Sequence, residues 1–153
     1  MKKWLFLSVL LIASCISLRD LWTTRYEYCG KVDVLEVYKG TYSFLSCKDA
    51  LAVTDAAYEI LWQKVGTLNQ PWRVEFMSGS ISVDDPYAFT DPVQRLIRIK
   101  EEQPRSILHE LRHAYMYETH TGGKTQHGTM CGDEAWLKLE REFEVLPYCH
   151  LVR

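Results

Sequence analysis

The sequence predicts a single α+β domain in which a small, mostly antiparallel sheet packs with a core helix, a second helix and a C-terminal helix. Residues 72–77 alternate apolar with charged side chains, which is the pattern of a half-buried strand. Residues 47–65 carry a wide apolar face at helical spacing, with Ser46 before them as a helix cap and Gly66 after them as a stop. The second helix is indicated by the apolar stripe within residues 104–119.

The other elements follow from turn and capping signals. Pro104 suits the first position of the second helix. Asp133 suits the start of the C-terminal helix, and residues 122–132 before it are expected to form a loop. The strands predicted from short apolar runs between turns are residues 31–38, 41–45, 72–77, 81–83 and 96–99, with a proline-containing loop at 84–92.

The first fifteen residues are expected to be a targeting signal. Two lysines precede an apolar stretch that is too short to span a bilayer, and Ile-Ala-Ser-Cys ends it at Cys15. That ending resembles a bacterial lipobox, which implies a lipid on Cys15 and a short tether over residues 16–24. The alternatives are a plain secretory signal and an uncleaved anchor. All three would place the domain, residues 25–153, outside the cytoplasm.

The cysteines agree with export. If Cys15 carries a lipid, an even number remains, and two disulfides are expected in an oxidising compartment. Four cysteines allow three connectivities; the shorter loops favour Cys29 with Cys47 and Cys131 with Cys149. The alternative, cysteines as zinc ligands, is disfavoured because none has Cys-x-x-Cys spacing.

Composition limits the size and the partners. About 138 residues remain after the signal, enough for one hydrophobic core and not for two. The formal net charge of -2 and the pI near 6.2 argue against nucleic acid and against a membrane partner held by charge.

The chemistry is concentrated in the run His109-Glu110-Leu111-Arg112-His113. Residues four apart lie on one helix face, so His109 and His113 can bind one metal ion with Glu110 beside them. Two nitrogen ligands, a third ligand and an open position for water make a catalytic zinc site, and Glu110 can act as its general base. The alternative is a surface helix with two solvated histidines, which the apolar stripe of this helix disfavours.

This arrangement resembles the zincin metallopeptidases, in which a strand, a short loop and the metal helix follow in that order. A later Glu-Ala at Glu134 makes residues 96–147 resemble a minimal gluzincin. The resemblance implies a zinc-dependent peptidase that acts on a peptide, a protein or peptidoglycan. Arg112 departs from the zincin consensus, and Lys138 stands where larger gluzincins have an aspartate. The metzincin pattern is excluded because Met116 and Thr119 occupy its glycine and histidine positions.

The third ligand stays open between three residues. The gluzincin resemblance implies Glu134, twenty-one residues after His113, and we predict this residue. His127, fourteen residues after His113, resembles the third ligand of SprT-like zincins, and Asp133 is the other candidate. His120 would lie roughly 10 Å further along the helix and is a poor ligand.

Two further expectations concern partners. In zincins an edge strand beside the metal helix binds an extended substrate by strand addition, and we expect residues 96–99 or 72–77 to have that role. The function from a different class is an envelope lipoprotein that binds a partner, with a structural or degenerate zinc site.

Overall fold

The computed structural model describes residues 25–78, 88–121 and 126–145, beginning with a β-hairpin. Strands β1 (Tyr26–Val32) and β2 (Leu35–Gly40) pair antiparallel around Asp33, whose φ of 50° lies in the left-handed region. Aspartate tolerates that conformation better than most residues. The single strand predicted at 31–38 is therefore wrong, because the chain reverses direction inside it. The strand predicted at 41–45 is also wrong, since these residues form turns and bends.

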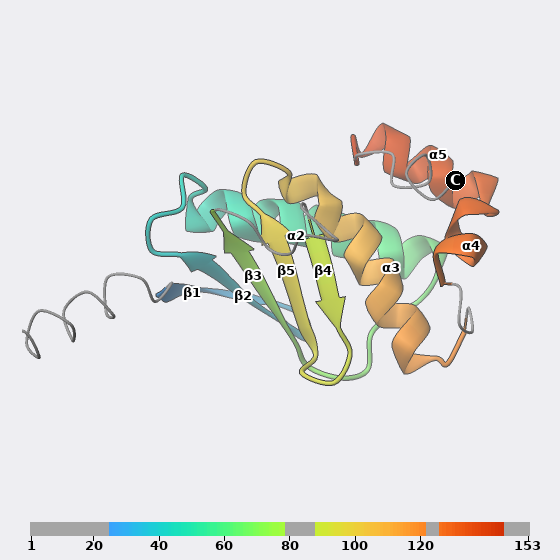
Figure 1. Cartoon of the computed structure of the whole chain (residues 1–153), viewed down its shortest axis with the longest axis horizontal. Coiled ribbons are helices and arrows are strands. Elements are labelled where there is room, and N and C mark those ends of the chain that lie inside the picture. The colour runs from blue at the N-terminus through green and yellow to red at the C-terminus, as the bar shows by residue number, and fades with distance from the viewer. Residues whose placement is uncertain (1–24, 79–87, 122–125, 146–153) are drawn as a thin grey trace, which may run out of the picture.

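One five-stranded sheet has the order β1-β2-β3-β5-β4 (Figure 1). The predicted strands at 72–77 and 96–99 are confirmed as β3 (Trp72–Met77) and β5 (Leu96–Lys100). The two outer pairings are antiparallel and the two inner pairings are parallel. The α+β class is confirmed.

Strand β4 (Ala88–Asp91) falls within the segment that was expected to be a loop. It is short, and the turn that returns it to β5 is held by Asp91, whose side chain accepts hydrogen bonds from the N–H groups of Val93 and Gln94 at 2.9 and 3.1 Å. The strand predicted at 81–83 lies outside the described residues.

The strand predicted to bind substrate, residues 96–99 or 72–77, is not an edge strand. β3 and β5 each have a neighbour on both sides, so neither has a free edge for strand addition. The edge strands of the described sheet are β1 and β4. Of these two, β4 packs beside α3 (Ile107–Glu118), the predicted metal helix.

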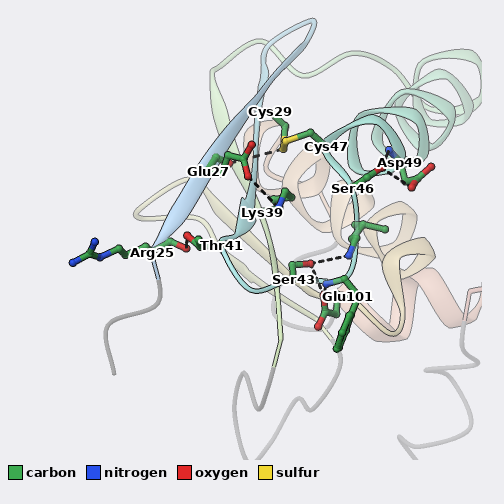
Figure 2. A network of polar contacts seen from close by, with 12 residues as sticks. Arg25, Glu27, Cys29, Lys39, Thr41, Ser43, Ser46, Cys47, Asp49 and Glu101 are labelled. Carbon is green, nitrogen blue, oxygen red and sulfur yellow. Dashed lines mark hydrogen bonds and ion pairs between the residues drawn. A yellow bond between two sulfur atoms is a disulfide. The ribbon is translucent and has the colours of Figure 1, made fainter. Parts of the chain in front are cut away.

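The long predicted helix is confirmed as α2 (Cys47–Lys64), which packs across β1 and β2. The Ser46 side chain caps it by accepting a hydrogen bond from the N–H of Asp49 at 3.1 Å. Figure 2 shows this start of the helix, where a disulfide joins Cys47 to Cys29 of β1. Glu101 fastens the preceding turn by accepting from the Ser43 hydroxyl and from the Phe44 N–H.

The core lies between one face of the sheet and the helices α2 and α3. The alternation of apolar and charged residues in the strands explains why one face of the sheet is apolar, because every second side chain of a strand points to the same face. The fully buried apolar side chains of this layer include Leu35, Val37, Leu61, Val74, Phe76, Ile97, Ile99, Ile107, Leu108 and Leu111.

Three further helices complete the described chain. The predicted metal helix begins with a 3₁₀ turn at Pro104–Ser106 and continues as α3 (Ile107–Glu118). Helix α4 (Gln126–Cys131) occupies part of the expected loop, and α5 (Glu134–Glu142) is the predicted C-terminal helix. In Figure 1, α3 runs beside β4, with α4 and α5 beyond it.

The predicted disulfide between Cys29 and Cys47 is confirmed. Cys131 is also disulfide-bonded, and its predicted partner Cys149 lies outside the described residues. The signal ending at Cys15 and the tether lie outside them too. Among the helices that the structure describes, none combines the length and hydrophobicity that crossing a membrane requires.

Candidate metal centre

Helix α3 carries two histidines and a glutamate that are almost completely buried. His109 is 0% exposed, Glu110 3% and His113 7%. The two histidines lie one turn apart, and their Nε2 atoms are 3.2 Å from each other. The sequence spacing thus brings the two rings together as expected on a helix.

The third member of the group is His127, from α4. Its Nε2 lies 3.1 Å from Nε2 of His113, and its ring is stacked on that of His109 at 5.4 Å between centroids. One nitrogen from each of the three rings lies within 4.8 Å of the other two. The three side chains therefore converge on one point from two helices.

The other candidate ligands are placed elsewhere. Glu134 is exposed at the first position of α5 and does not belong to the histidine group. Asp133 caps α5 by accepting from the N–H of Trp136 at 3.1 Å, and its second oxygen pairs with Arg112 at 3.1 Å. The structure thus brings in His127, an alternative, in place of the predicted Glu134. Asp133 caps α5, and Glu134, the first residue of that helix, faces solvent.

Both histidines of α3 are oriented through their second nitrogen. Nδ1 of His109 lies 2.8 Å from Oε1 of Glu140, a carboxylate that is 5% exposed and also accepts from the Trp136 indole N–H at 2.7 Å. Nδ1 of His113 lies 2.7 Å from Oε1 of Gln126. Metal-binding histidines almost always donate their other N–H in this way.

These contacts determine which nitrogen of each ring presents its lone pair to the centre. A carboxylate and an amide oxygen accept only, so Nδ1 of His109 and of His113 must carry the proton. Burial, followed by the charge of His109, lowers the pKa of His113 to about 3, which keeps its ring neutral. The neutral ring of His113 then points a bare Nε2 lone pair at Nε2 of His109 across 3.2 Å, an arrangement that a cation between the two nitrogens would stabilise.

Two of the nitrogen separations match those between ligands of a tetrahedral metal ion. Zinc–nitrogen bonds of about 2.0–2.1 Å at tetrahedral angles place two ligand atoms about 3.3 Å apart. The two contacts of His113 Nε2 measure 3.2 and 3.1 Å. A tetrahedral ion held by three histidines has one further coordination position.

Arg112, the departure from the zincin consensus, has a structural role. Its guanidinium lies over the Trp136 ring at 4.6 Å and pairs with Asp133. Both contacts join α3 to α5, the helix that supplies Glu140. The arginine therefore helps to hold the carboxylate that orients His109.

Glu110 is contacted from the sheet. Oγ1 of Thr90 on β4 lies 2.5 Å from Oε2 of Glu110. The sequence prediction missed Thr90 because it lies in the segment expected as a loop, and it missed Gln126 for lack of any local signal. Glu140 had one signal, since it stands four residues after Trp136 on the apolar face of its helix, where a carboxylate needs a partner.

We expect Glu140→Ala to weaken zinc binding by about 10–100-fold, because a lost partner of this kind leaves a ligand ring unoriented. Zinc affinity is measured by competition with a chromophoric chelator. Glu142→Ala on the same helix is the control; its side chain is exposed and should leave the affinity unchanged. Equal affinities for the two variants would contradict the role of Glu140.

Comparisons of the chain with protein-family models, with curated proteins and with solved structures gave no significant match. The assignment of a function therefore depends on the residues of the centre and on their geometry.

Proposed function

We propose that the protein is a zinc-dependent metallopeptidase whose metal ligands are His109, His113 and His127 and whose general base is Glu110. The observation that carries the proposal is the convergence of three imidazole nitrogens, together with the buried side chain of Glu110 directly after His109 on α3. Three neutral imidazoles with an open fourth position form a ligand set that suits zinc. The proposal replaces Glu134 with His127 and keeps the other predicted residues.

A zinc ion at this point would lower the pKa of water to about 7 and polarise the scissile carbonyl. Glu110 would take the proton of the attacking water and pass it to the leaving amine. Glu140 and Gln126 would keep the ligand rings in place during these steps, because each accepts the Nδ1 proton of one ring.

The edge strand β4 offers the position for the substrate. An extended peptide can add to a free strand edge through backbone hydrogen bonds, which require no particular side-chain sequence. β4 pairs with β5 on one side and packs beside α3, so a peptide added to it would lie along the helix that carries Glu110. We therefore infer that the substrate is an extended peptide segment, from a free peptide, a protein or peptidoglycan.

We also propose that the domain works outside the cytoplasm, held at the membrane by a lipid on Cys15. Two disulfide-bonded sites, Cys29–Cys47 and Cys131, support an oxidising compartment, because such bonds are rare in the cytosol.

The test measures zinc, activity and folding in one preparation. We expect about one zinc ion per chain, hydrolysis of an unstructured protein such as casein, loss of that activity on chelation and its return on adding zinc. The circular dichroism of the chelated protein should stay that of a folded domain, since the core cluster of the described residues is made of apolar side chains and includes none of the three histidines. Bound zinc without hydrolysis, together with unfolding on chelation, would instead indicate a structural site.

A further inference from the structure

The contact between Thr90 and Glu110 joins the general base to the edge of the sheet. Thr90 Oγ1 lies 2.5 Å from Oε2 of Glu110 and 3.3 Å from the backbone oxygen of the same residue. Alternate residues of a strand share a face. Ala88, two residues earlier, is completely buried and Thr90 is half-buried, whereas Phe89 between them is exposed. Thr90 thus lies on the face of β4 that packs towards α3.

We propose that Thr90 is a positioning residue for catalysis, which holds the Glu110 carboxylate at the metal centre and ties the base to the strand that receives the substrate. The inference rests on the proposed function and extends it to a residue outside the zinc-binding helices.

The chemistry of the two groups sets the direction of the hydrogen bond. An ionised carboxylate only accepts, so the threonine hydroxyl donates its single proton to Oε2. Hydrogen bonds to a charged oxygen are short and strong, in keeping with the 2.5 Å separation. The carboxylate oxygens share one plane, so a donor fixed to Oε2 restricts how the whole group can turn. A base with fewer orientations meets the water in the reactive geometry more often.

The position of Thr90 adds a link to the substrate. β4 is an edge strand of the described sheet, with β5 as its partner on one side. A peptide that adds to the other side of β4 would hold this four-residue strand from both edges. The hydroxyl of Thr90, and with it the Glu110 carboxylate, would then be fixed by the same event that brings the scissile bond to the centre.

Two variants of Thr90 separate the hydroxyl from the shape of the side chain. Thr90→Val keeps the branched shape and removes the donor, and we expect its kcat to fall by about 10–100-fold with KM within about twofold and zinc content unchanged. Thr90→Ser keeps the donor and should retain most of the wild-type kcat. Thr119→Val is the matched control, because this hydroxyl donates to the Tyr115 carbonyl at the far end of the same helix, at 2.8 Å.

A second readout does not depend on activity. The melting temperature of the zinc-free protein is measured for Thr90→Val, Glu110→Ala and the double variant. If the hydrogen bond forms, Thr90→Val lowers the melting temperature in the wild-type background and by much less when Glu110 is already alanine. Additive changes would overturn the inference.

The outcomes distinguish the inference from the function on which it rests. A wild-type protein that binds zinc and hydrolyses no peptide would overturn the proposed function, and the catalytic role of Thr90 with it. A wild-type protein that hydrolyses peptides while Thr90→Val keeps the wild-type kcat would overturn the role of Thr90 alone. Loss of kcat in Thr90→Val, rescue in Thr90→Ser and a non-additive cycle together support it.

Discussion

Glu110→Gln is expected to abolish hydrolysis while the zinc ion stays bound. Glutamine keeps the length of the side chain and can still accept a hydrogen bond from Thr90, so the packing of this buried position is retained. Its amide cannot take a proton from water, and the loss of a general base costs about 10²–10⁴-fold in rate. The measurements are kcat on a peptide substrate and zinc content per chain, both on the same sample.

The control for this substitution is Glu102→Gln, which removes one negative charge at an exposed position shortly before the same helix. It should leave kcat and zinc content at their wild-type values. If Glu110→Gln hydrolyses peptides at the wild-type rate, another group must take the proton. If the variant loses its zinc instead, Glu110 is needed for metal binding. The loss of activity would then not be evidence that Glu110 is the general base.

Local periodicity predicted the helices α2, α3 and α5 and the central strands β3 and β5. Ser46 and Gly66 mark the two ends of α2 in the sequence, and the alternation over β3 identifies the side chains that face the core. These signals depend on neighbours within about two turns of a helix or a few residues of a strand. They do not encode which strand lies beside which, because that order is set by pairings between distant segments. The assignment of an edge strand therefore failed.

The hairpin shows a second limit of the same kind. Val32 and Val34 fit the apolar pattern of a continuous strand. The chain turns between them because Asp33 adopts a left-handed backbone conformation. Aspartate adopts this conformation more often than most residues, but too rarely for a turn to be predicted from one aspartate alone. The same holds for β4, where four residues are too few for an alternation to stand out.

The metal centre, too, could be predicted only in part from the sequence. The spacing of His109 and His113 is a local property of one helix, so their proximity could be predicted. The third histidine comes from a separate helix, and both His127 and Glu134 lie at distances along the chain that a loop could close. A favourable helix start argued for Glu134. In the structure, the capping residue Asp133 is also held by Arg112, and Glu134 turns to solvent.

His127→Ala and Glu134→Ala therefore give opposite expected results. A partner that merely orients a zinc ligand is worth about 10–100-fold in affinity, so loss of the ligand His127 should cost more than about 100-fold. Glu134→Ala removes an exposed side chain and should leave zinc affinity and hydrolysis unchanged. Chelator competition and peptide hydrolysis are measured for both, with circular dichroism to show that each is folded. The reverse result would restore the gluzincin-like ligand set. It would also contradict the placement found here, in which Glu134 is exposed and His127 lies with His109 and His113.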